Sequence, residues 1–111
     1  MTKTTRSIYI AGPMSGIENH NKESFMDAHE MLKGEGWENI FNPIMSPASR
    51  LVQEGKISGQ EAYRQCMALD LKFICEEADA IYMLVGWEKS PGARAEHATA
   101  TCLSLNIFYE V

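Results

Sequence analysis

The chain has 111 residues, of which 45% are hydrophobic and 23% charged, a composition typical of one globular domain and not of a disordered chain. Its net charge is −5 and its lysines and arginines are scattered singly, so the basic stripe of a DNA- or RNA-binding protein is missing. No apolar run approaches the roughly 18 residues of a membrane-spanning helix, and no signal-peptide core is present. We therefore expect a cytoplasmic domain that binds neither a nucleic-acid polymer nor a membrane.

The first half of the chain alternates strand and helix patterns. Residues 7–11 are rich in β-formers and stop at a Gly-Pro pair, which predicts a strand followed by a turn. Apolar residues at helical spacing predict a helix over residues 21–35, and a short second strand is expected over residues 37–41. Residues 42–58 contain two prolines and a glycine, which predicts a long irregular loop, a kind of segment often tied to function.

The second half repeats the alternation. A helix is predicted over residues 58–77, and the most hydrophobic run of the chain predicts a central strand over residues 80–85. A glycine-rich loop leads into a helix over residues 91–103, and the last strand is expected over residues 105–109. This order predicts an α/β three-layer sandwich around a parallel sheet of four to five strands.

Cysteine and histidine spacing gives no metal site. The three cysteines form no CxxC motif, and Cys66 and Cys75 would point to opposite sides of a helix. We expect buried, reduced thiols, as is usual in a cytosolic protein. His20, His29 and His97 lack ligand spacing, and we expect them at the surface.

Three loops follow the carboxyl ends of predicted strands, where ligands bind in open parallel sheets. Their candidate binding residues are Gly12, Pro13, Met14, Ser15 and Gly16 after the first strand, Asn42 after the second, and Trp87, Ser90 and Gly92 after the third. The first loop has neither a GxGxxG nor a P-loop pattern, so it could equally be a plain turn. Trp87 could stack on a base, whereas Trp37 is expected in the core.

Glu96 is the most informative residue of the predicted last helix. It shares a helical face with Ala93, Ala100 and Leu103, which we expect to point toward the sheet. Burying a carboxylate is costly unless something uses it, although a helix N-terminus favours the anion. The alternative is a glutamate that reaches solvent from the helix start.

Two other side chains have more than one interpretation. Asp70 stands beside Leu69 and Leu71, a setting that can raise the pKa of a carboxyl group and make it a proton donor. The alternative for Asp70 is a solvated helix face. Ser90 can cap the last helix and also offer its hydroxyl to an anion there, or it can serve as a cap alone.

Several segments together carry a family resemblance. In chain order they are Ile8-Tyr9-Ile10-Ala11-Gly12-Pro13-Met14-Ser15-Gly16, Asn42-Pro43, Asp70, Ala78-Asp79-Ala80-Ile81, and the Gly86-Trp87-Glu88-x-Ser90-x-Gly92-Ala93-x-x-Glu96 run. This arrangement resembles the nucleoside 2-deoxyribosyltransferase-like superfamily, and within it a small phage and prophage branch carried as a domain of unknown function (4406-like). The resemblance spans nearly the whole chain. It implies a flavodoxin-like (Rossmann-like) fold in a single domain over residues 1–111.

The resemblance also implies an activity on a nucleoside or nucleotide. The superfamily includes enzymes that exchange bases between deoxynucleosides and enzymes that hydrolyse the N-glycosidic bond of deoxynucleoside 5′-monophosphates. Glu96 matches its nucleophile, Asp70 the acid that protonates the leaving base, and Tyr9 a residue that orients the nucleophile. Ser90 matches a phosphate-binding serine. The positions whose backbone approaches the ligand are matched by Gly12, Ser15, Gly16 and Gly92. Two carboxyl groups can divide these roles without metal or cofactor.

The sequence also departs from this pattern. Met14 and Ser15 occupy the place of an arginine in the hydrolases, and Arg50 or Arg64 could replace that cation. Ala98 stands where the larger enzymes often have glycine. Larger relatives complete the site from a neighbouring subunit, so we expect a homodimer or larger homo-oligomer. The rival function is a non-catalytic module that binds a nucleotide or an ADP-ribose-like ligand, with a regulatory or counter-defence role in a phage.

Overall fold

The computed structural model describes residues 6–14, 16–46, 51, 54–57 and 59–111. In this part of the chain four parallel strands form one sheet in the spatial order β2-β1-β3-β4. The strands are β1 (Ser7–Ala11), β2 (Asn39–Phe41), β3 (Ala80–Met83) and β4 (Asn106–Tyr109). The parallel sheet and the flavodoxin-like α/β architecture expected from the sequence are therefore confirmed.

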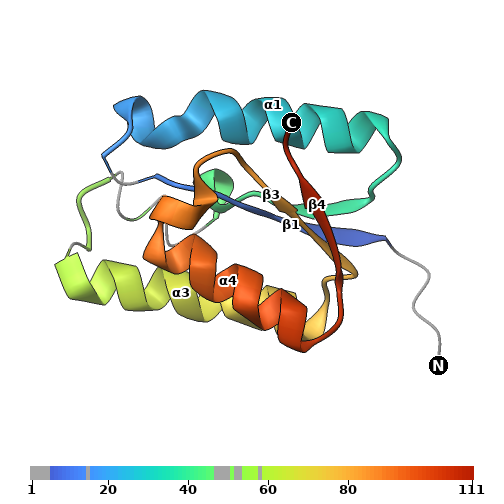
Figure 1. Cartoon of the computed structure of the whole chain (residues 1–111). Helices are drawn as coiled ribbons and strands as arrows, with labels where there is room; N and C mark the ends of the chain where they lie inside the picture. Colours follow the sequence, from blue (N-terminus) through green and yellow to red (C-terminus); the bar gives the residue numbers. More distant parts are fainter. Residues whose placement is uncertain (1–5, 15, 47–50, 52–53, 58) are drawn as a thin grey trace.

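Helices cover both faces of the sheet. Helix α1 (Lys22–Gly34) lies on one face, and α3 (Gly59–Glu76) and α4 (Pro91–Cys102) lie side by side on the other (Figure 1). Short 3-10 segments occupy three predicted loops, namely η1 (Glu18–Asn21), η2 (Pro43–Met45) and η3 (Trp87–Lys89). Within the described residues, the predicted ends of the helices and strands differ from the observed ends by no more than about two residues, as is usual for element boundaries.

The core lies on both faces of the inner strand β1. All of its side chains are buried, as expected for a parallel strand covered on both sides. Ile8 and Ile10 pack in the cluster that contains Phe25 of α1, whereas Tyr9 packs with Phe73 of α3 on the opposite face. Because side chains alternate along a strand, Tyr9 is the β1 residue directed toward the α3–α4 layer.

The buried face of α3 includes Asp70, so the solvated helix face that the sequence left open for Asp70 is wrong. Asp70 is 7% exposed and Ile74 is 1% exposed, while the neighbouring Leu69 is 37% exposed. Asp70 is buried because α3 packs against α4, while Phe73 and Ile74 of the same helix pack with Tyr9 of the sheet. Leu103, expected to face the sheet, is 44% exposed because α4 ends one residue earlier.

The expectation of three buried thiols is wrong. Cys75 and Cys102 are exposed near the ends of their helices, and Cys66 is half-buried. All three are free thiols. None of the described helices is both long enough and apolar enough to cross a membrane.

Candidate functional site

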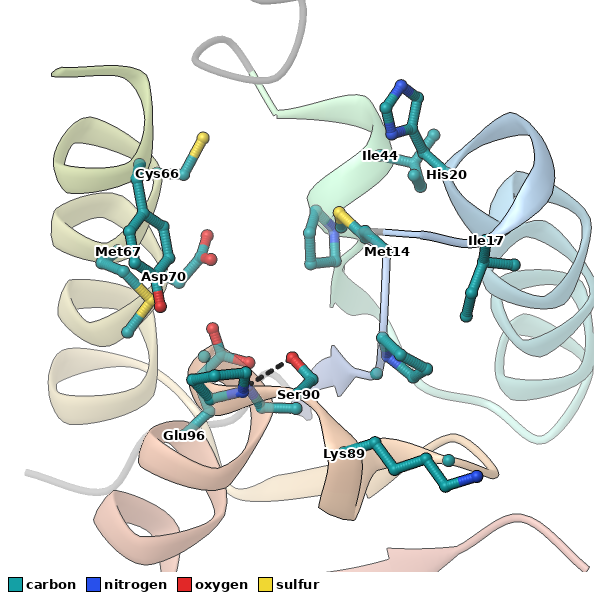
Figure 2. A pocket seen from close by; sticks show the side chains of 18 of the residues that line it. Met14, Ile17, His20, Ile44, Cys66, Met67, Asp70, Lys89, Ser90 and Glu96 are labelled. Atoms are coloured by element: carbon teal, nitrogen blue, oxygen red, sulfur yellow. Dashed lines mark hydrogen bonds between the residues drawn. The ribbon is translucent and has the colours of Figure 1, made fainter. Parts of the chain in front are cut away.

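A cavity of about 1120 Å³ lies at the carboxyl ends of β1 and β3. Helix α3 forms one wall, the loop after β1 and η2 form the opposite wall, and the start of α4 lies between them (Figure 2). The predicted site residues that line it are Tyr9, Gly12, Pro13, Met14, Asp70, Ser90, Gly92 and Glu96. The sheet edge at which ligands were expected is therefore hollowed, and most of the proposed site meets there.

Tyr9 and Glu96 form a buried contact at the inner end of the cavity. The Tyr9 hydroxyl donates a hydrogen bond of 2.9 Å to Oε2 of Glu96. Tyr9 is fully buried and Glu96 is 5% exposed. Ala93 and Ala100 flank Glu96 on the buried face of α4, and their small side chains let this helix lie close to the sheet. Glu96 therefore does not reach solvent, which was the alternative left open by the sequence.

Asp70 completes a cluster of three polar groups. Burial raises its pKa from 3.8 to about 6, although hydrogen bonds with Glu96 and Tyr9 oppose that rise. Burial, followed by the charge of Asp70, raises the pKa of Glu96 well above its ordinary value. The Tyr9 pKa is also raised, mainly by burial, so its hydroxyl stays protonated as a donor. Near neutral pH the two carboxyl groups therefore share a proton, because ionising both in one buried site is unfavourable.

Ser90 caps helix α4 at the edge of the cavity. Its Oγ accepts a hydrogen bond of 3.2 Å from the Ala93 backbone N–H, drawn as the dashed line in Figure 2. The hydroxyl proton is not used in this cap, so Ser90 can still donate to an anion beside the positive end of the helix dipole. Both roles predicted for Ser90 are thus compatible with its position.

Lys89 is a cavity residue that the sequence analysis missed. It precedes the N-cap and lines the cavity, with its ammonium group directed away from Glu96 in Figure 2. Arg64 is exposed and does not line the cavity, and Arg50 lies outside the described residues. The signal that could have identified Lys89 is its place in the loop after a central strand.

The α3 wall holds further residues that the sequence analysis missed. Tyr63 and Met67 line the cavity, seven and three residues before Asp70. These spacings place all three on one helical face. Helical periodicity extended backward from Asp70 would have found them.

Two predicted binding residues have other roles in the structure. The Asn42 side chain accepts a hydrogen bond of 3.1 Å from the Ile44 backbone N–H and donates one of 3.4 Å to the Phe25 carbonyl oxygen. Asn42 thus joins η2 to α1 behind the cavity wall. It is not one of the described residues that line the cavity. Gly16 is also outside the lining, and its φ of +78° places it in a turn that favours glycine. Ser15 lies outside the described residues.

Gly12 is required by packing against the core. A Cβ there would lie 2.8 Å from the Leu84 side chain, too close to be accommodated without movement. The absence of a side chain therefore lets the end of β1 approach the segment after β3. This steric need is independent of any ligand, even though Gly12 borders the cavity.

Trp87 belongs to an aromatic cluster on the outer side of α4. Its ring stacks on His97 with centroids 4.3 Å apart, and His97 Nε2 lies 2.8 Å from the Tyr109 hydroxyl. Trp87 is not among the described residues that line the main cavity. The prediction that Trp87 stacks on a base thus has no support in its position, because η3 directs its ring toward His97.

The described residues contain no group of three or more His, Cys, Asp or Glu side chains arranged to hold a metal ion. Residues 6–109 match the model of a family described as a domain of unknown function, DUF4406. Because the match covers nearly the whole chain, the chain belongs to this family. No curated protein matches it.

Proposed function

We propose that this protein cleaves the base–sugar bond of a deoxynucleoside or a deoxynucleoside 5′-monophosphate, and that its family is a branch of the nucleoside 2-deoxyribosyltransferase-like superfamily. Glu96 is the nucleophile and Asp70 is the acid. The observation that carries this proposal is a pair of buried carboxyl groups with raised pKa values, one of them bonded to Tyr9, at the inner end of a cavity. Carboxyl pairs divided into nucleophile and acid are typical of retaining glycosidases.

In the first step a carboxylate oxygen of Glu96 attacks the anomeric carbon C1′. The C1′–N bond breaks and its electron pair leaves with the base, while the Asp70 proton is transferred to a base nitrogen. The products of this step are the free base and an ester between Glu96 and the sugar. Tyr9 supports it by holding Glu96 through Oε2.

In the second step a water molecule attacks C1′ of the ester. Asp70, now ionised, accepts a proton from that water, and the bond between C1′ and the Glu96 oxygen breaks. Both carboxyl groups return to their starting state. A second base in place of water gives base exchange, so hydrolysis and transfer share the first step.

The proton must be on Asp70 when the sugar arrives. Before substrate binds, the shared proton favours Glu96, because burial and the neighbouring Asp70 charge raise the Glu96 pKa well above its ordinary value. Asp70 and Glu96 interact with each other and with Tyr9 in one buried cluster, so the proton can pass between them without leaving the cavity. A sugar that develops positive charge at C1′ favours the ionised form of Glu96 and thereby sends the proton to Asp70.

The size of the cavity favours a second candidate function. Ligand pockets usually measure about 300–1,000 Å³, and this cavity is about 1120 Å³. A non-catalytic module that holds a larger nucleotide or an ADP-ribose-like ligand would use the same space. Assembly into a homodimer or larger oligomer remains an expectation for either function, and light scattering tests it.

A base-release panel distinguishes the two functions. The protein is incubated with the four deoxynucleosides and their 5′-monophosphates, and free base is measured by chromatography, with Glu96→Gln as the control. Release by the wild type but not by the control supports the glycosidase or transferase. Tight binding by calorimetry without release favours the binding module, and neither binding nor release contradicts both.

A further inference from the structure

We propose that Tyr63 and Met67 form the subsite for the leaving base and make the site selective for bicyclic purine bases over single-ring pyrimidines. This inference rests on the proposed function, because it takes Asp70 as the acid beside that base. It concerns the α3 wall of the cavity, which lies across from the loop after β1 (Figure 2).

The three residues form a row along α3. Asp70, Met67 and Tyr63 all line the cavity, and spacings of three and seven residues place them on one face of the helix. With a rise of about 1.5 Å per residue, Met67 lies about 4.5 Å and Tyr63 about 10 Å from Asp70 along the helix axis. The row therefore begins at the buried acid and continues toward the N-terminal end of the helix.

The outer part of this row offers a flat apolar surface. Tyr63 is 48% exposed although it lines the cavity, so part of its ring is open to a ligand. A Cβ built on Gly92 would lie 3.5 Å from Met67 Sδ and 3.6 Å from the Tyr63 hydroxyl, which places both side chains against the first turn of α4. An aromatic ring and a thioether both bind a flat heterocycle favourably.

The opposite wall presents apolar side chains to Met67, and it also includes His20. Met14, Ile17 and Ile44 lie across the cavity from Met67 (Figure 2). A base between these walls is held by contact with carbon and sulfur, and Asp70 supplies a proton at its inner end. The fit between the base and the α3 row, and not a pattern of hydrogen bonds, then decides which bases are accepted.

Because Asp70 lies at the inner end of the row, the fit between base and helix favours a two-ring base over a single ring. The base must touch Asp70 to receive its proton, so it begins at the inner end of the row. A single ring there is covered by Met67, whereas a fused bicyclic ring extends on to Tyr63. Small differences in apolar contact change kcat/KM by about 10- to 200-fold, and we expect a purine preference of at least tenfold that depends on Tyr63.

The experiment compares kcat/KM for deoxyadenosine and deoxyguanosine with that for thymidine and deoxycytidine, and repeats the comparison with the 5′-monophosphates. Because purine and pyrimidine bonds differ in intrinsic lability, the readout is the change in the purine-to-pyrimidine ratio between wild type and variants. Tyr63→Ala should lower this ratio at least tenfold, mainly through a higher KM for purines, while Tyr63→Phe should retain it. Leu69→Ala is the matched control, since Leu69 is on α3 outside the cavity lining.

The outcomes separate this inference from the proposed function. Base release whose purine-to-pyrimidine ratio is the same in wild type and Tyr63→Ala overturns the subsite and leaves the glycosidase intact. Absence of release from every substrate contradicts the proposed function, and calorimetry with free adenine and free cytosine then tests the subsite alone. Adenine binding that is lost in Tyr63→Ala supports the subsite, and adenine binding that is unchanged in Tyr63→Ala, or absent from the wild type, overturns it.

Discussion

Glu96 and His97 are adjacent on α4, and they belong to clusters of opposite character. Glu96 faces inward to Tyr9 and Asp70, where two carboxyl groups have raised pKa values because they are buried together. His97 faces outward, stacks on the Trp87 ring and forms a hydrogen bond with Tyr109. Two adjacent residues of α4 thus belong to different clusters. The inner cluster opposes folding when its carboxyl groups ionise, whereas the outer aromatic cluster stabilises the fold.

The energetic difference between the clusters has a definite pH dependence. The unfolded chain loses the Asp70 proton near pH 3.8, whereas the folded protein retains it to about pH 6. The contribution of Asp70 to folding stability is therefore fully present below the unfolded pKa and is lost as pH rises through about 6, since the folded state binds this proton more tightly. A pKa rise from 3.8 to about 6 corresponds to about 3 kcal/mol. A cost of this size, borne by a buried group beside a cavity, is typical of a functional site.

The largest effect is expected from Glu96→Gln. Removing the proposed nucleophile while keeping the shape of the side chain should lower base release at least about 10⁴-fold. The same change removes one of two buried carboxyl groups whose ionisation opposes folding at high pH, so the thermal midpoint at pH 8 should equal or exceed that of the wild type. Chromatographic base release and thermal unfolding measured on the same sample test both statements. Turnover at the wild-type rate would end the nucleophile assignment.

The next largest effect is expected from Asp70→Asn. Loss of general acid catalysis should slow base release by about 10²–10⁴-fold. The slowing should be greatest for bases that leave poorly without protonation. It should be smallest for an aryl 2-deoxyriboside whose leaving group is a nitro-substituted phenol. Rates measured across a series of leaving groups provide the test. Equal slowing for every member would remove Asp70 as the acid.

The architecture around these two residues could be predicted from the sequence, because strand and helix periodicity fix a parallel α/β sheet and its ligand-binding edge. Glu96 was identified because a carboxylate among alanines on an amphipathic helix conflicts with that periodicity. The exact buried face of α3 could not be predicted, since contact with α4 turned Asp70 inward and Leu69 outward. The surroundings of Trp87 could not be predicted, because sequence alone does not show that its ring stacks on His97.

The pH dependence of kcat/KM tests whether Asp70 and Glu96 titrate as a pair. The active form has one proton on the pair, so kcat/KM should rise through about pH 6 and fall at higher pH as the second proton is lost. Each limb should change the rate about tenfold per pH unit. In Asp70→Asn the alkaline limb should disappear while the acid limb remains. A flat profile in the wild type would contradict a shared proton.

A smaller effect is expected at the cation beside the helix start. If the substrate is a 5′-monophosphate, Lys89→Ala should raise its KM by about tenfold, because a charge-assisted contact is lost. The KM for the matching nucleoside should stay the same. Arg64→Ala is the control, since Arg64 is exposed on α3 outside the cavity lining. An unchanged KM for the 5′-monophosphate in Lys89→Ala would place the phosphate elsewhere.

The smallest effect on activity is expected from the outer aromatic cluster. Trp87→Ala removes the ring that stacks on His97, 4.3 Å away, while the hydrogen bond between His97 and Tyr109 can remain. Loss of an aromatic pair costs about 0.5–1.5 kcal/mol beyond the lost buried area, so the thermal midpoint should fall by several degrees. Base release should stay within about twofold of wild type at 25 °C, because Trp87 borders the outer side of α4 and Glu96 the inner side. A large loss of kcat in a folded Trp87→Ala protein would show that the two clusters are coupled through α4. It would contradict the claim that the outer cluster acts on stability and not on base release.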